Sequence, residues 1–293
     1  MKSVTLRAYA KINLSLDVVG KREDGYHLLQ SVFQGISLYD NVKVTREEGD
    51  GGITVRCNLP YIPTDERNIV HKVATAFFKA AGIDRYQITV EMEKFIPTGA
   101  GMGGGSADGA AVFSALCRLY DRPFPIEQAI QLLTPIGADI PFFLYSGTML
   151  AEGVGEILTP APTMPDCCIV LAKPRASAST KEIFGKLHEV GIPRHPDTQG
   201  VLRALEQKDL RALAAATGNV LENATIPLCP RIGYLKELLA KQGAILSMMT
   251  GSGSTVFGLF ENEKAARKAM RILRNQNETV FMAHPVCRPM KTE

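Results

Sequence analysis

The sequence of 293 residues carries a formal net charge of +3 and an apolar fraction of 45%, typical of a globular protein with one large or two ordinary domains. The slight positive charge forms no basic stripe interleaved with aromatic residues, so we expect no nucleic-acid partner. No apolar run reaches the length of a membrane span and no signal-peptide pattern precedes the first strand pattern, so we expect no membrane association. The six cysteines form no Cys-x-x-Cys pair, which favours unpaired thiols in a reducing cytoplasm.

Alternation of apolar and polar residues predicts the first strand over residues 6–19. One face of this strand carries only hydrogen-bonding side chains, at Lys11, Asn13, Ser15 and Asp17. A glycine turn at 20–25 follows. Four patterns complete this part of the chain: an apolar stretch at 32–38, strands at 41–45 and 53–57, and a helix at 68–81 that Gly82 ends.

The next unit is a strand at 88–93, a glycine-rich loop at 97–107 and an alanine-rich helix that continues to residue 120. A short helix is predicted at 127–133, and the segment 137–141 opens another.

Prolines at 160, 162 and 165 indicate a domain boundary, so we expect one domain over residues 1–159 and a second over 160–293. The second half alternates helices with a few strands. The clearest patterns are strands at 169–172, 256–260 and 280–283, a capping box at 179–182 and a helix at 264–275. We therefore predict an α/β (α+β) protein in two halves, with mixed sheets covered by helices.

The glycine-rich loop is the most informative segment because it joins a strand to a helix. Such a turn gathers backbone N–H groups at the positive end of a helix dipole, which is a ready site for phosphate. It is not a Walker A loop, since Gly105-Ser106-Ala107 contains no lysine. Its G-x-G-x-x-G spacing does not follow a first strand, and Asp121 ends a helix rather than a second strand, which disfavours a dinucleotide fold.

Two side chains outside this loop could carry chemistry. Lys11 could neutralise a transferring phosphoryl group, although a strand lysine is more often a solvated charge. Asp139 precedes an apolar helical segment and could accept a hydroxyl proton or hold a metal. An Asp in that place is also a common helix cap.

Two further segments suit a nucleotide-bearing ligand. The turn at 251–254 is a second small-residue turn beside a strand, and it could be a simple β-turn or a second phosphate clamp. Tyr26 and His27 follow a glycine turn and could stack on and hydrogen-bond a flat ring.

Together these segments resemble the GHMP kinases, the family that includes galactokinase, homoserine kinase and mevalonate kinase. Three motifs carry the resemblance in order, at residues 8–14, 97–107 and 249–253. Two more segments, 21–27 with its Gly-Tyr-His end and 137–143, are similar to the branch whose substrate carries a cytidine diphosphate. The resemblance covers nearly the full length of the chain.

The resemblance implies two α/β domains with the active site between them, where ATP with Mg²⁺ phosphorylates a hydroxyl of a small cytidine diphosphate substrate. Asp139 would be the catalytic base, with Lys11 stabilising charge, and Ser106 and Asp139 are the candidate metal ligands. The ATP triphosphate would lie on Pro97, Gly99, Gly101, Gly103, Gly104, Gly105 and Ser106, with Asn68 and Lys94 near the adenine. Tyr26 and Phe184 would sandwich the cytosine and His27 would read its edge, while the rest of the substrate would contact Asn13, Thr180, Gly251 and Ser252. We expect the chain to be a monomer or weak homodimer.

The same residues leave three other interpretations open. A different kinase of the family, acting on an uncharged and ringless substrate, would not need Tyr26 and His27. A ligand-binding relative without catalysis would be favoured by loss of Lys11 or Asp139, and both are present. A structural nucleotide-binding protein would not need the third motif.

Overall fold

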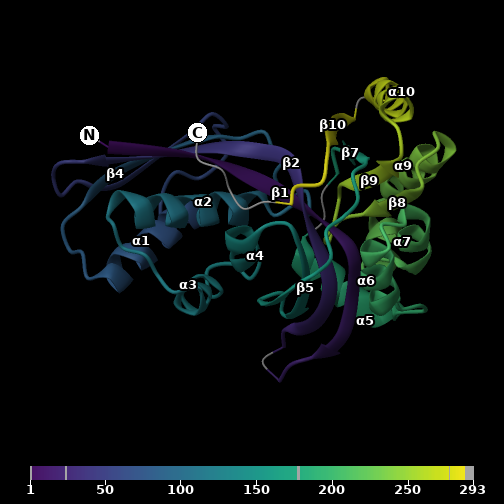
Figure 1. Ribbon diagram of the computed structural model, residues 1–293, viewed down its shortest axis with the longest axis horizontal. Helices are drawn as coiled ribbons and strands as arrows, with labels where there is room; N and C mark the ends of the chain where they lie inside the picture. Colours follow the sequence, from purple (N-terminus) through teal and green to yellow (C-terminus); the bar gives the residue numbers. More distant parts are fainter. Residues whose placement is uncertain (1, 24, 177–178, 277, 288–293) are drawn as a thin grey trace.

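Two β-sheets organise the part of the chain that the structure, a computed structural model, describes: residues 2–23, 25–176, 179–276 and 278–287 (Figure 1). In the first sheet the described strands run in the order β3-β4-β2-β5-β6, and β1 pairs with β2 off this path. The strands are β1 (Lys2–Lys21), β2 (His27–Glu47), β3 (Gly52–Cys57), β4 (Gln87–Glu93), β5 (Thr148–Gly153) and β6 (Ile157–Pro160).

Strands β1 and β2 form one long antiparallel hairpin, longer than the sequence predicts. The two segments expected separately at 32–38 and 41–45 are parts of the single strand β2. Register shifts near Tyr9, Asn13 and Val18 interrupt the pairing, and such bulges bend a strand and disturb its simple alternation. Both faces of residues 11–17 are buried, including the face that carries Lys11 and Asp17, because elements of the second half of the chain also pack against this strand.

Four helices pack on one face of the first sheet: α1 (Ile69–Ala81), α2 (Gly104–Leu119), α3 (Ile126–Leu133) and α4 (Ile140–Tyr145) (Figure 1). Helix α1 begins one residue after the predicted start, because Asn68 is its N-cap and its side chain accepts from Val70 N. Gly82 ends the helix as predicted, with a φ of 65°. Helix α2 begins three residues before the predicted start at residue 107, since Gly104-Gly105-Ser106 already forms its first turn.

The second sheet is antiparallel, in the order β10-β7-β9-β8. Its strands are β7 (Cys168–Lys173), β8 (Leu246–Met249), β9 (Val256–Phe260) and β10 (Thr279–Ala283). The helices of this half are α5 (Thr180–Val190), α6 (Thr198–Glu206), α7 (Leu210–Ala216), α8 (Glu222–Leu228), α9 (Pro230–Lys241) and α10 (Glu263–Arg274). The predicted mixed α/β class is confirmed. None of the helices in the described ranges has the length and apolar character needed to span a bilayer.

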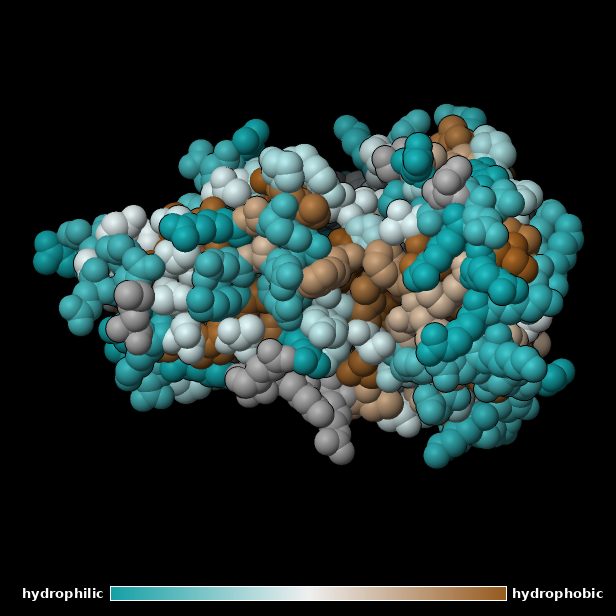
Figure 2. All heavy atoms as spheres, turned by 90° about the horizontal axis from the view of Figure 1, so that it is seen from above, coloured by the Kyte–Doolittle hydropathy of each residue, from teal (hydrophilic) through white to brown (hydrophobic). Residues whose placement is uncertain are grey.

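One hydrophobic cluster is shared by both sheets. Ile12 and Leu14 of β1 pack in the same cluster as Leu171 of β7 and Phe257 of β9. Seen from above, hydrophilic residues cover both ends of the molecule and apolar residues show between them (Figure 2). The strand that carries Lys11 therefore lies where the two halves meet, while the expected division at residue 160 stays a prediction.

Candidate active site

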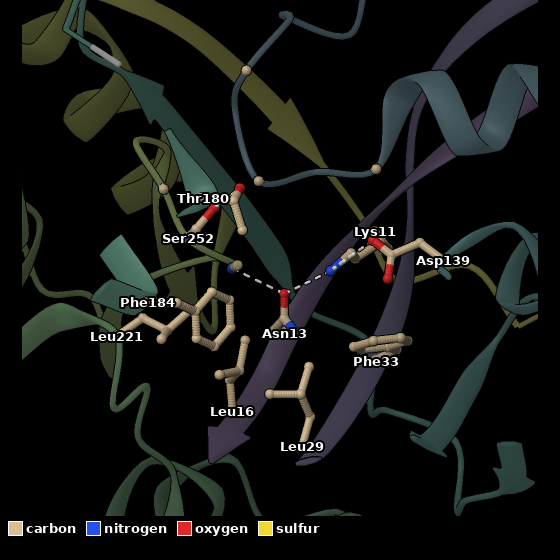
Figure 3. Close-up of a pocket in the computed structure, with 15 residues that line it drawn as sticks. Lys11, Asn13, Leu16, Leu29, Phe33, Asp139, Thr180, Phe184, Leu221 and Ser252 are labelled. Atoms are coloured by element: carbon tan, nitrogen blue, oxygen red, sulfur yellow. Dashed lines mark hydrogen bonds and ion pairs between the residues drawn. The ribbon is translucent and has the colours of Figure 1, made fainter. Parts of the chain in front are cut away.

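A pocket of about 260 Å³ lies where β1, the glycine-rich loop, helix α5 and the turn after β8 meet (Figure 3). It brings together residues that are far apart in the sequence and that the sequence singles out. These lining residues are Lys11, Asn13, Gly99, Gly101, Gly103, Asp139, Thr180, Phe184, Gly251 and Ser252.

Lys11 is not a solvated strand lysine, because it is only 4% exposed. Its ammonium lies 2.9 Å from Asn13 Oδ1, to which it donates, and 3.6 Å from Asp139 Oδ2. The Phe33 ring lies beneath it, 4.4 Å from ring centroid to Nζ. Lys11 therefore presents a fixed positive charge inside the pocket.

Asp139 occupies the N-cap position of α4 without capping it. Its side chain accepts no hydrogen bond from the first turn of the helix. The carboxylate faces Lys11 instead, and about a third of the side chain (34%) remains exposed to the pocket (Figure 3). The position matches the cap interpretation, but the carboxylate is free to interact with a ligand.

Asn13 connects β1 to the turn after β8. Its Oδ1 accepts from Lys11 Nζ, from Gly251 N at 2.9 Å and from Thr250 Oγ1 at 3.1 Å. Its Nδ2 donates to Ser31 Oγ at 2.9 Å. The side chain is thus largely occupied by partners inside the protein, and its predicted contact with substrate stays a prediction.

The glycine-rich loop lines a second cavity of about 510 Å³, together with Ile69, Lys94 and Thr180. Gly99, Gly101 and Gly103 all have positive φ, of 59°, 72° and 71°. A Cβ atom on Gly101 would collide with the carbonyl oxygen of Thr250, so the loop crosses the third motif closely. No side chain caps α2, which leaves its first-turn N–H groups available to an anion.

Asn68 and Lys94, expected near an adenine, are engaged differently. Asn68 caps α1 and donates to Pro63 O at 2.6 Å, and it does not line the cavity of the glycine-rich loop. Lys94 lines that cavity, but its ammonium is buried between Asp40 and Asp108. Complete burial raises the pKa of Asp108 to about 8, although the nearby Lys94 charge opposes the shift.

An aromatic cavity of about 740 Å³ adjoins this site, lined by Tyr26, His27, Phe184 and His188 among others. Tyr26 is 64% exposed. His27 is stacked on Phe184, with ring centroids 4.5 Å apart, so the predicted Tyr26–Phe184 sandwich would require His27 to move from that face. Burial is the largest cause that lowers the pKa of His27, and the nearby His188 and Lys21 lower it further.

Thr180 and Ser252, both predicted to contact the substrate, meet at the pocket, and that role stays a prediction. Thr180 Oγ1 and Ser252 Oγ are 2.9 Å apart. Thr180 also lines the glycine-rich-loop cavity and the aromatic cavity, so it lies where all three join.

Several residues that shape the site could not be identified from the sequence alone. Asn219 Nδ2 donates to Met249 O at 2.9 Å and Gly251 O at 2.8 Å, which holds the third motif in place. Phe33 and His188 read as ordinary core and surface residues. Asp108 could have been noticed in the sequence, because it is an acidic residue among the alanines on the face of a helix that packs against a sheet.

The site can supply oxygen ligands for a magnesium ion that also binds phosphate. Ser106 Oγ lies beside Gly137, two residues before Asp139. Mg²⁺ usually takes one or two protein oxygens and fills its shell with phosphate and water. Within the described residues, no group of three or more His, Cys, Asp or Glu side chains could hold a metal by itself.

Proteins with related sequences share both halves of this arrangement. The family model described as "GHMP kinases N terminal domain" matches residues 68–147, and that described as "GHMP kinases C terminal" matches residues 201–279. A 4-diphosphocytidyl-2-C-methyl-D-erythritol kinase from Lachnospira eligens is 42% identical over 278 residues, covering 95% of this chain and 96% of that protein. The protein of the same name from Clostridium novyi is 40% identical over 280 residues, covering 96% of this chain and 99% of that protein.

Solved structures of kinases also superpose on the chain. A crystal structure of 4-(cytidine 5'-diphospho)-2C-methyl-D-erythritol kinase superposes with a TM-score of 0.80 at 31% identity, covering 96% of this chain and 98% of that chain. A homoserine kinase from Cytophaga hutchinsonii, at 18% identity and a TM-score of 0.79, covers 100% of this chain and 98% of its own, and it shows the fold alone. The chain belongs to the GHMP kinase family and is a small-molecule kinase.

Proposed function

We propose that the chain transfers the γ-phosphoryl group of ATP to the 2-hydroxyl of 4-diphosphocytidyl-2-C-methyl-D-erythritol, a step of non-mevalonate isoprenoid precursor synthesis. The names of relatives that are 42% and 40% identical over almost the whole chain support this substrate. The observation that carries the chemistry is the Lys11–Asp139 pair, placed between the glycine-rich-loop cavity and the aromatic cavity.

In the proposed reaction Asp139 accepts the proton of the attacking hydroxyl. The hydroxyl oxygen forms a bond to the γ-phosphorus while the bond from that phosphorus to the β,γ-bridging oxygen breaks, and ADP leaves. The Lys11 ammonium, 3.6 Å from Asp139 Oδ2, pairs with that carboxylate and offsets the negative charge that spreads over the phosphoryl group. Positioning and charge stabilisation are the main demands of phosphoryl transfer, and both are met by these side chains.

The glycine-rich loop is the proposed ATP site. Pro97, Gly99, Gly101, Gly103, Gly104, Gly105 and Ser106 line its cavity, where open N–H groups at the start of α2 favour the triphosphate. Ser106 and Asp139 are the proposed protein ligands of Mg²⁺, which would neutralise phosphate charge when bound. Contacts of Asn68 and Lys94 with the adenine remain part of the proposal.

The aromatic cavity is the proposed cytidine site. Tyr26, His27 and Phe184 supply rings and a hydrogen-bonding edge for the cytosine, and Thr180 and Ser252 lead from there toward Asp139. Because His27 covers one face of Phe184, the base would enter as the imidazole leaves. The free thiols support action in a reducing compartment, and we propose the cytoplasm.

The substrate is tested by an ATP-consumption assay with the cytidine diphosphate alcohol, homoserine and mevalonate as separate acceptors. We expect turnover with the first acceptor alone. Preferential turnover of homoserine or mevalonate would contradict the proposed substrate and leave the chain a kinase of another specificity.

The base role is tested with Asp139→Asn, which keeps the side-chain shape and removes the proton acceptor. We expect turnover to fall by a factor of about 10² or more, with ATP binding retained. Asp209→Asn is the matched control, because Asp209 also precedes a helix but caps it through bonds to Arg211 N and Ala212 N. Near-normal turnover of Asp139→Asn would remove Asp139 from this role.

A further inference from the structure

A buried cluster of three ionisable side chains lies beneath the glycine-rich loop, apart from the reacting groups. Lys94 Nζ is 2.5 Å from Asp40 Oδ2 and 2.5 Å from Asp108 Oδ2. Lys94, Asp40 and Asp108 are 7%, 0% and 2% exposed. Two carboxyl groups thus share one ammonium in the protein interior, where removing charge from water is costly. Burial raises the pKa of one of them, Asp108.

The three residues come from the elements that flank the loop. Lys94 follows β4 directly, where the chain leaves the sheet toward Pro97, and Asp108 lies in the second turn of α2, where the loop has ended. Asp40 belongs to neighbouring β2, and its Oδ1 accepts from Phe95 N at 2.5 Å and Ile96 N at 2.8 Å. One carboxylate therefore holds the start of the loop, and the lysine links it to the helix at the end.

The cluster is poorly explained as a device for stability. Asp108 Oδ1 is buried and has no hydrogen-bond partner among the described residues, which is a cost that an apolar side chain would avoid. Replacing buried ionic groups by apolar residues of similar shape is often neutral or stabilising. In some proteins a buried ionisable cluster that costs stability fixes the geometry of the chain around it.

We propose that Asp40, Lys94 and Asp108 form a positioning clamp that fixes the two ends of the glycine-rich loop at the spacing needed to bind the ATP triphosphate. The inference rests on the proposed assignment of that loop to ATP. Gly99, Gly101 and Gly103 give the loop left-handed conformations that glycine exchanges readily with others. Fixing both ends reduces the number of conformations that the free loop can adopt. Less conformational entropy is then lost when ATP binds, and the affinity for ATP rises.

Lys94 is close enough to the loop to transmit this constraint. A Cβ atom built on Gly104, the first residue of α2, would lie 3.4 Å from Lys94 Nζ and 2.9 Å from Ile96 Cγ2. The helix start is thus packed directly on the residues that Asp40 holds. A shift of Lys94 would move the N–H groups that are to meet the phosphates.

The test uses Asp108→Leu, which keeps the branching of the side chain, removes the link to α2 and leaves Lys94 paired with Asp40 alone. We expect the KM and Kd for ATP to rise about tenfold or more, while kcat at saturating ATP and the KM for the acceptor stay within about threefold. Asp108→Asn can still accept from Lys94 and should bind ATP within about threefold of the unaltered chain. Asp108→Ser adds no volume, and the same weakening as in Asp108→Leu is expected for it.

Glu278→Leu is the matched control from the second half of the chain. Glu278 is a buried carboxylate bound to Arg231 at 2.7 Å, and it also has one oxygen without a partner among the described residues. We expect its ATP binding to be unchanged. The clamp is overturned if Asp108→Leu and Asp108→Ser bind ATP normally, or if Glu278→Leu weakens ATP binding equally. An unaltered chain that binds no ATP would contradict the proposed function itself, and the clamp with it.

Discussion

The environment of Lys11 in the structure differs from the one that its sequence pattern suggests. In the sequence it is a lysine in an alternating strand, for which solvent is the usual environment. In the structure its ammonium contacts Asn13, Asp139 and the Phe33 ring inside the pocket. The bulges of β1 and the packing of the second half against it account for the burial, and neither follows from the local pattern.

Lys11→Met keeps the aliphatic stem and removes the charge. We expect kcat to fall by a factor of about 10² to 10³, as for the loss of one preorganised charge-stabilising group. Steady-state kinetics measure the loss, and Lys43→Met is the control. Lys43 is also a strand lysine with a carboxylate partner, Glu91 at 2.9 Å, but both are about half exposed. Equal effects of the two changes would argue against a special role for Lys11.

Asp108 predicts a dependence of stability on pH. The folded-state pKa is raised to about 8, whereas an unfolded Asp has a pKa of about 4, so the folded chain binds the extra proton between these values. The unfolding free energy due to this group therefore falls as pH rises from about 4 to 8. Asp108→Asn removes this contribution, so its stability relative to the unaltered chain should increase over that range. Urea denaturation at pH 5.5 and 7.5 measures the difference, and a difference independent of pH would contradict the assignment.

Among the elements, those with local start and stop signals could be predicted closely. Helix α1 lies between Asn68 and Gly82 as expected, and β9 has the predicted limits. The long strand β2 could not be predicted as one element, because its polar middle at Tyr39 and Asp40 reads as a break. Asp40 is buried there under Lys94, a contact between residues 54 positions apart that no local pattern contains.

The same division holds for the site. The three glycine-rich or lysine-bearing motifs and Asp139 could be found from the sequence, because backbone conformation and helix starts leave local signals. The supports could not be found in this way. Asn219 and His188 act through partners distant in the chain, and their polar side chains look ordinary in sequence.

Two glycines of the loop should respond differently to the same substitution. In Gly99→Ala the alanine must adopt a left-handed conformation, but its Cβ meets nothing within 4 Å. We expect the free energy of unfolding to fall by about 1–2 kcal/mol. Gly101→Ala adds a collision with the backbone of Thr250, so its loss should be larger and its ATP binding weaker. Chemical denaturation and ATP titration compare the pair. Equal stability losses would show that the loop does not cross the third motif this closely.

At the scale of the whole molecule, the hydrophobic cluster shared by both sheets makes the stability of each half depend on the other. Ile12 is fully buried in that cluster, with residues of both sheets around it. Backbone bonds reinforce the junction, since Leu16 N donates to Gly218 O at 2.9 Å and Val220 N donates to Leu16 O at 3.0 Å. A proposed boundary at residue 160 therefore separates sequence segments, and the folded parts remain joined through β1.

Ile12→Ala should lower the stability of the whole chain by about 2–5 kcal/mol, because it opens a cavity in the shared cluster. Calorimetry should still show one unfolding transition, moved to lower temperature. Val19→Ala is the control on the same strand, where the side chain is 55% exposed and the expected change is about 0.5 kcal/mol or less. Two separate transitions, of which one alone moves, would contradict a shared core.

Thr180 has a consequence for inhibitors of the chain. Thr180 borders the pocket of Lys11, the cavity of the glycine-rich loop and the aromatic cavity, and no other residue that the structure describes lines all three. The glycine-rich-loop cavity and the aromatic cavity share this threonine, so a compound that occupies both can be joined beside its side chain with a short linker. With so short a tether the second group binds at a high effective concentration, so two weak fragments joined there gain avidity without any new contact.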